Sequence, residues 1–172
     1  MDIIFTGCGI NQTVNNNDSN NNLVWWIDPN GDFHTNDLHR AQGQIPFIII
    51  IPSYLPANFS YDNMRILGPY ESEIVEDIEI EITFKRDDDR VYIREHNHLI
   101  FMKPNNELDP IYHDIAGVIV LRQIAQIVDS SGITEGLVFD WNQNNVAFSV
   151  ELFNVSEDEG IKIVESMITQ MK

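Results

Sequence analysis

Histidines and a single cysteine are the residues of this chain whose chemistry could define a site. His96 and His98 are separated by one residue, so in a strand both imidazoles would point to the same side and could share a metal ion. His113 or Asp114 could add a ligand. Two histidines on a polar strand are more commonly just solvated, so the sequence predicts no metal, no cofactor and no catalytic residue. A metal-assisted enzyme around His96, His98 and His113 stays an alternative.

Cys8 is the only cysteine, which excludes an internal disulfide. The preceding residues Phe5-Thr6-Gly7 and the following Gly9 resemble a bacterial lipobox, in which the cysteine receives lipid. A secretory signal also needs about 7 to 15 apolar residues, and here only Ile3 to Phe5 precede the box. The motif predicts lipidation at Cys8, and a free thiol is the alternative.

Residues 11–22 read NQTVNNNDSNNN, a polar run that cannot bury enough apolar area to fold. We therefore expect residues 1–22 to be a leader with a disordered spacer, and residues 23–172 to be one domain. No segment approaches the roughly 18 to 20 apolar residues of a membrane span. Membrane contact is accordingly expected only through a lipid anchor at Cys8.

The charge balance restricts the partners. Ten Lys and Arg against 27 Asp and Glu give a formal net charge of -17, which repels phosphate backbones and argues against nucleic-acid binding. The chain also contains no Walker motif, no GxGxxG and no GxSxG elbow. The sequence therefore predicts a non-enzymatic domain that binds an unknown protein or small ligand.

Aromatic residues offer the best candidates for that ligand site. Tyr54 lies in an irregular corner, Ser53 to Phe59, and Trp141 comes directly before a turn. Aromatic side chains are enriched at recognition surfaces, although core packing is their commoner role. We predict Tyr54 and Trp141 as the ligand-binding edge positions.

Hydrophobic periodicity predicts an α+β fold: a mainly antiparallel sheet of about six to eight strands, covered by a C-terminal helix and one short N-terminal helix. The segments predicted to form strands are 23–27 with 33–34 as a hairpin, 45–52, 74–84, 91–102, 117–128, and 137–141 with 146–152 as a second hairpin. Asn36 or Asp37 is expected to cap a short helix through Ala41, and Ser156 to cap the terminal helix, with Glu159 at the capping-box position. Residues 85–90, KRDDDR, are predicted to form a charged hairpin tip.

Several short motifs resemble the domain-of-unknown-function family 4367. They are Phe47 followed by an apolar run and Pro52-Ser53-Tyr54-Leu55-Pro56, Trp141 before a hairpin, Ser156-Glu157-Asp158-Glu159, and Ile163-Val164-Glu165-Ser166-Met167. The resemblance covers residues 38 to 172, and Ile115 to Val120 matches the strand that precedes the Trp hairpin in that family. Ala57-Asn58 stands where the family usually has Glu-Gly.

The resemblance implies a domain of bacterial envelope lipoproteins with no catalytic residues to carry over. It agrees with the interpretation of Cys8 and places the domain at the extracytoplasmic face of the envelope. A cytosolic adaptor or regulatory domain with a free amino terminus is the alternative.

Overall fold

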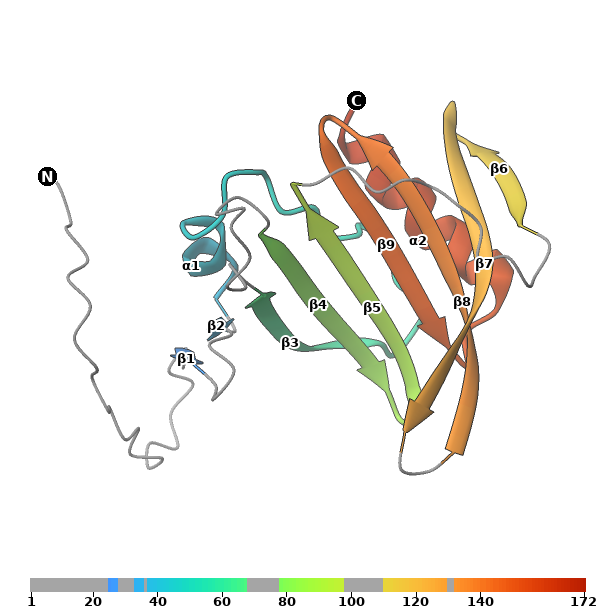
Figure 1. Cartoon of the computed structure of the whole chain (residues 1–172), viewed down its shortest axis with the longest axis horizontal. Helices are drawn as coiled ribbons and strands as arrows, with labels where there is room; N and C mark the ends of the chain where they lie inside the picture. The colour runs from blue at the N-terminus through green and yellow to red at the C-terminus, as the bar shows by residue number, and fades with distance from the viewer. Residues whose placement is uncertain (1–24, 28–32, 36, 68–77, 98–109, 130–131) are drawn as a thin grey trace, which may run out of the picture.

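The computed structural model describes residues 25–27, 33–35, 37–67, 78–97, 110–129 and 132–172. These residues form one antiparallel sheet of nine strands in the order β1-β2-β3-β4-β5-β9-β8-β7-β6, with two helices (Figure 1). The predicted α+β class, with a mainly antiparallel sheet, a C-terminal helix and a short N-terminal helix, is confirmed. Neither described helix is long and apolar enough to cross a membrane.

The first elements agree with the predicted hairpin and short helix. Strand β1 (Trp25–Ile27) pairs antiparallel with β2 (Phe33–Thr35), and α1 (Leu38–Gln42) follows. Asp37 caps α1, because its carboxylate accepts hydrogen bonds from the backbone nitrogens of His39 and Arg40 at 3.0 and 3.3 Å.

Three long strands continue the sheet from β2. They are β3 (Ser60–Leu67), β4 (Glu79–Arg86) and β5 (Asp89–His96). The alternation of the sequence predicts β4 and β5, but β3 was not predicted, because the segment SYDNMRIL has only a weak period of two. The turn between β4 and β5 contains Asp87, whose φ is 52°.

The second half of the sheet is an antiparallel meander whose last strand, β9, pairs with β5. It consists of β6 (Ile111–Ile115), β7 (Val118–Asp129), β8 (Gly132–Gln143) and β9 (Val146–Phe153). Asn144 and Asn145 make the β8–β9 turn with φ of 53° and 63°, which asparagine tolerates better than most residues. The strand assignment for residues 117–128 and the second hairpin are therefore confirmed.

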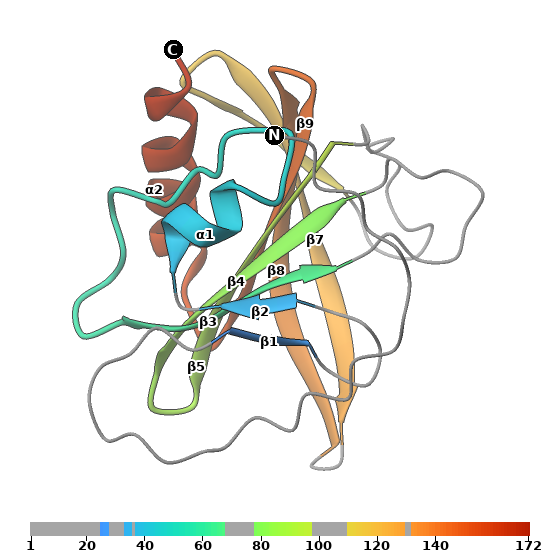
Figure 2. The ribbon, with the colours of Figure 1, turned by 90° about the vertical axis from the view of Figure 1, so that its left-hand side faces the viewer.

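Helix α2 (Glu157–Gln170) closes the chain and packs on one side of the sheet (Figure 2). Its buried face consists of Ile163, Val164, Met167 and Ile168. Ser156 caps the helix, with Oγ accepting from the Glu159 backbone nitrogen at 3.4 Å. The predicted cap is confirmed, although the Glu159 carboxylate binds Tyr54 and Lys162.

The segment 45–52 is not the buried strand that the sequence predicts. It belongs to a strap without regular secondary structure, residues 44–59, that runs beside α2 (Figure 2). Side chains satisfy its backbone: Ile49 N donates to Gln42 Oε1 at 2.9 Å, and Gln170 Nε2 donates to Ile51 O at 3.0 Å. The side chain of Ile48 is 74% exposed. A proline-bracketed apolar run can thus lie against the core without joining a sheet.

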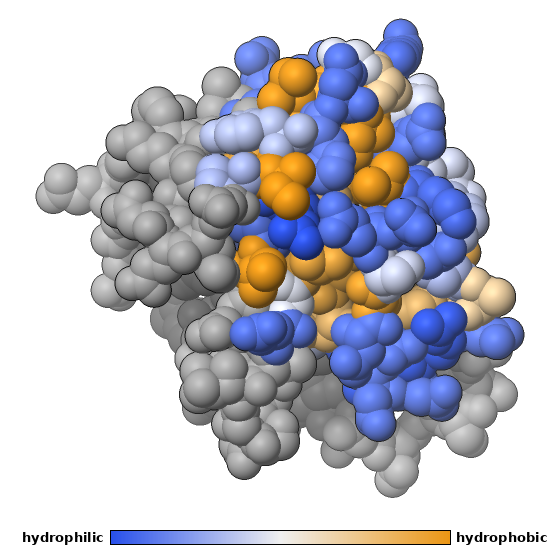
Figure 3. Space-filling view, turned by 90° about the vertical axis from the view of Figure 1, so that its right-hand side faces the viewer, coloured by the Kyte–Doolittle hydropathy of each residue, from blue (hydrophilic) through white to orange (hydrophobic). Residues whose placement is uncertain are grey.

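The sheet has two faces of different chemistry. The helix face, covered by α2 and the strap, carries the core residues of the central strands, which include Ile80, Ile82, Val91, Ile93, Phe139, Trp141, Phe148 and Val150. The outer face carries the alternate residues and includes Arg65, Glu79, Glu81, Arg94, Asp140 and Glu151. The side of the molecule with the edge strand β6 exposes apolar groups among polar ones (Figure 3), and Ile111, Tyr112 and Ile119 are 42–52% exposed.

Candidate functional site: the Tyr54 pocket

A pocket of about 540 Å³ opens where the strap, the end of β4 and the start of α2 meet. We call it the Tyr54 pocket. Its lining residues are Tyr54, Pro56, Ala57, Arg86, Asn154, Val155, Ser156 and Glu159. They come from three segments, residues 54–57, Arg86 and residues 154–159. These segments lie far apart in the sequence, so only the fold brings them together.

Tyr54 is held in the pocket at both ends. Its backbone nitrogen donates to Ser166 Oγ at 3.3 Å, and its hydroxyl donates to the Glu159 carboxylate. Lys162 donates to Glu159 Oε1 at 2.9 Å, and its Nζ lies 5.8 Å from the centre of the Tyr54 ring. An aromatic ring, a carboxylate and a cation thus form one connected group.

The hydrogen bond between Tyr54 and Glu159 shifts both pKa values. The bond raises the pKa of the Tyr54 hydroxyl, and burial adds to this effect. The same bond, followed by the hydrogen bond from Lys162, lowers the pKa of Glu159. Glu159 is therefore a carboxylate and Tyr54 a neutral phenol at neutral pH.

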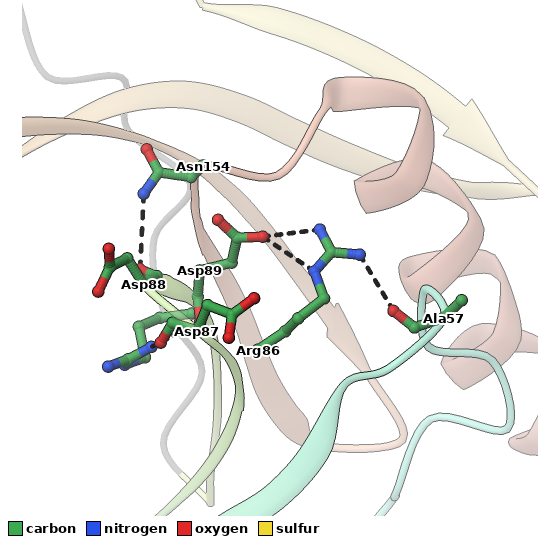
Figure 4. A network of polar contacts seen from close by, with 7 residues as sticks. Ala57, Arg86, Asp87, Asp88, Asp89 and Asn154 are labelled. Carbon is green, nitrogen blue, oxygen red and sulfur yellow. Dashed lines mark hydrogen bonds and ion pairs between the residues drawn. The ribbon is translucent and has the colours of Figure 1, made fainter.

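Arg86, at the end of β4, is another lining residue of the pocket, and Figure 4 shows its polar contacts. Its Nε and NH2 donate to Asp89 Oδ2 at 2.9 and 2.7 Å, and its NH1 donates to Ala57 O at 3.0 Å. The guanidinium carbon also lies 4.7 Å from the centre of the Phe59 ring. With its donors directed to these partners, Arg86 ties the strap to the β4–β5 turn and fixes the pocket's shape.

The β4–β5 turn also contacts the connection between β9 and α2. Asn154, at φ 57°, donates from Nδ2 to the backbone oxygen of Asp88 at 3.5 Å. Figure 4 shows Asp87, Asp88 and Asp89 gathered beside Asn154, and the side chains of Asp87 and Asp88 are exposed. The backbone of Asp88 thus adjoins the lining residue Asn154, and Asp89 pairs with the lining residue Arg86, but none of the three aspartates lines the pocket.

Of the two aromatic residues predicted to bind a ligand, one lies in the pocket and the other in the core. Tyr54 lines the pocket, but Trp141 is 0% exposed and stacks on Phe148 with ring centres 5.0 Å apart. The predicted edge position of Trp141 is wrong. The alternation along β8 turns its indole to the helix face, where α2 covers it.

The predicted histidine site is not assembled among the described residues. His96 ends β5 and His113 lies in β6, with β9, β8 and β7 between them. At about 4.8 Å per strand spacing the two residues are roughly 19 Å apart, too far to share an ion. His113 instead lies beside Glu157, with Nε2 3.4 Å from Oε1. His98 and Cys8 lie outside the described residues, as does the spacer before residue 23.

No group of three or more potential metal ligands occurs within the part of the chain that the structure describes. Sequence reasoning missed Arg86, Asn154 and Glu159 as pocket residues. The Ser156-to-Glu159 capping signal placed Glu159 in the first turn of α2, but nothing local indicated that its carboxylate would bind Tyr54.

Comparisons of the chain with protein-family models, with curated proteins and with solved structures found no match. The resemblance to the domain-of-unknown-function family 4367 therefore stays a prediction.

Proposed function

We propose that this chain is a non-enzymatic binding domain of the bacterial cell envelope, anchored by lipid at Cys8, that takes its ligand in the Tyr54 pocket. One observation carries the proposal. The pocket combines an aromatic ring with a carboxylate of lowered pKa, and both are held by contacts from the strap and α2. Preformed pockets with a few fixed polar groups are typical of ligand sites.

The interactions around the pocket favour recognition. Tyr54 is held by Ser166 and Glu159, and Arg86 is held by Asp89 and Ala57. Groups that are fixed in this way lose little conformational entropy when a ligand binds. An acidic domain that is tethered through Cys8 can present such a pocket to partners outside the membrane.

Filling the pocket tests its role. Ala57 lines the pocket with an exposed side chain, so Ala57→Trp should occupy the cavity without opening the core. Glu165→Trp, on an exposed position of α2, is the matched control. Proteins or small molecules of the host should be retained by the wild-type chain and by Glu165→Trp and lost with Ala57→Trp. Equal retention by all three chains contradicts the proposal.

The location needs a separate experiment. The mass of the mature amino terminus, measured in membrane and soluble fractions of the native host, should show diacylglycerol on Cys8, and Cys8→Ser should move the protein to the soluble fraction. An intact Met1 in the soluble fraction would instead favour the cytosolic adaptor.

A further inference from the structure

A second, smaller cavity adjoins the Tyr54 pocket. It has a volume of about 240 Å³ and is lined by Ile124, Glu135, Gly136, Leu137, Leu152, Asn154 and Val155. Asn154 and Val155 line both cavities. The two cavities therefore meet at the β9–α2 connection.

The two cavities differ in chemistry. The Tyr54 pocket presents a phenol ring, the Glu159 carboxylate and Arg86, whose guanidinium is already paired with Asp89. The second cavity is lined mainly by aliphatic side chains, Ile124, Leu137, Leu152 and Val155. One half thus suits a cation and the other half suits an apolar group.

We infer that the two cavities form one groove for a basic, extended peptide, whose Lys or Arg side chain enters the Tyr54 pocket while a neighbouring apolar side chain enters the second cavity. This inference rests on the proposed function and names the ligand class. The chain's net charge of -17 attracts a basic partner over long range.

The chain itself shows which chemistry the Tyr54 pocket attracts. The Lys162 ammonium already lies 2.9 Å from Glu159 Oε1 and 5.8 Å from the Tyr54 ring centre, and its side chain is 53% exposed. A cation of the ligand can take the same carboxylate and the same ring face. Because Lys162 is solvated, displacing its ammonium costs little.

The second cavity explains why a peptide fits better than a small cation. A free cation would use only the Tyr54 pocket, whereas the shared residues Asn154 and Val155 lead directly into an apolar space. Successive side chains of an extended chain alternate in direction, so an extended peptide can place two side chains of one face in two adjacent cavities.

The test uses the full chain and fluorescent Gly-Ser peptides that carry one Arg and one Leu at varied separations. Anisotropy titrations should show binding of an Arg–Leu peptide, and no binding of the matching Glu–Leu peptides. Glu159→Gln should weaken binding about tenfold, the equivalent of roughly 1.4 kcal/mol. Lys162→Gln should strengthen binding, because it removes the internal competitor.

A substitution of Ile124, which lines the second cavity, tests the role of that cavity. Ile124→Ser should weaken binding of the Arg–Leu peptide and leave the weaker binding of an Arg–Ser peptide unchanged. If Ile124→Ser weakens binding of both peptides equally, or if Lys162→Gln weakens binding of the Arg–Leu peptide, the inference is overturned. Thermal unfolding of each variant identifies those that fail to fold, and Leu137→Ser then replaces Ile124→Ser.

The failure of this inference is distinct from the failure of the proposed function. If no Arg–Leu peptide binds but Ala57→Trp still abolishes retention of a host ligand, the groove does not take basic peptides and the pocket function stands. If Ala57→Trp leaves retention intact, the pocket function itself is lost.

Discussion

Glu81 and Glu95 are buried carboxyl groups on the neighbouring strands β4 and β5, but they lie on opposite faces of the sheet. Glu81, 5% exposed on the outer face, lies 2.8 Å from Arg65 Nε and 3.0 Å from Arg94 Nε. Glu95, 0% exposed on the helix face, accepts from Ile50 N at 3.0 and 3.2 Å. One face supplies cations and the other supplies a backbone donor of the strap.

This difference sets opposite protonation states. Burial alone would raise the pKa of Glu81, but the hydrogen bonds and charges of Arg65 and Arg94 outweigh burial and lower its pKa. Burial raises the pKa of Glu95 to about 8, and the hydrogen bond from Ile50 reduces the shift only in part. Of these two buried carboxyl groups, only the one that two arginines reach has a lowered pKa, because one amide dipole does not replace the lost hydration.

Breaking the charge cluster of the outer face should have the largest effect. Arg94 lies 2.8 Å from Glu151, 3.0 Å from Glu81 and 3.4 Å from Glu79. Arg94→Met leaves these carboxylates close together, and we expect a loss of about 3 kcal/mol in the free energy of unfolding. Urea denaturation at neutral pH measures the loss.

The matched control for this prediction is Lys162→Met, which removes a cation from an exposed pair on α2. Its cost should stay below about 0.5 kcal/mol. Similar losses for both variants would show that burial of the Arg94 cluster adds nothing to its strength.

Glu95→Gln should have the next largest effect, and its sign depends on pH. The folded state holds the Glu95 proton more tightly than the unfolded state, so its stabilisation is complete below the ordinary glutamate pKa and is lost as pH rises through about 8. Glutamine keeps an uncharged side chain that accepts from Ile50. The variant should match the wild type near pH 5 and exceed it near pH 8. The rise of the Glu95 pKa from 4.5 to about 8 would correspond to about 5 kcal/mol at about 1.4 kcal/mol per pKa unit, and we expect a difference of about 2 kcal/mol because the buried site relaxes when Glu95 ionises.

Urea denaturation across this pH range gives the result for Glu95→Gln. An equal difference between variant and wild type at every pH would mean that Glu95 does not change its charge on unfolding.

Glu81→Gln should show the opposite pH dependence and a smaller effect. The pKa of Glu81 is lowered, so its stabilisation is present above the ordinary glutamate pKa and is lost as pH falls through the folded value. We expect the variant to be about 1 kcal/mol less stable than the wild type at neutral pH, because two arginines lose one of their partners. The same denaturation series should bring the two proteins together in acid.

Much of the fold could be predicted from local patterns. Ile80, Ile82 and Phe84 alternate with polar residues and do face the core. Asp37 and Ser156 cap the helices that the sequence places after them. These predictions hold because alternation and capping depend on neighbouring residues.

The errors share one cause. The apolar run 45–52 has the composition of a strand, but hydrophobicity does not show whether its backbone pairs with a strand or with the side chains of Gln42, Glu95 and Gln170. Trp141 was placed at an edge because it precedes a turn, but α2 covers its side of β8. Both errors concern contacts across the sequence that no local pattern contains.

The sequence by itself determined the alternating strands, the capped helices and the net negative charge, because each follows from residue type and local spacing. Only the tertiary structure decided that Glu159 would meet Tyr54, that Arg94 would join three glutamates, and that Glu95 would lie under the strap. The physical reason is that hydration and charge interactions depend on distance through space. Two carboxyl groups with the same chemistry therefore acquire opposite pKa shifts once folding turns them to different faces.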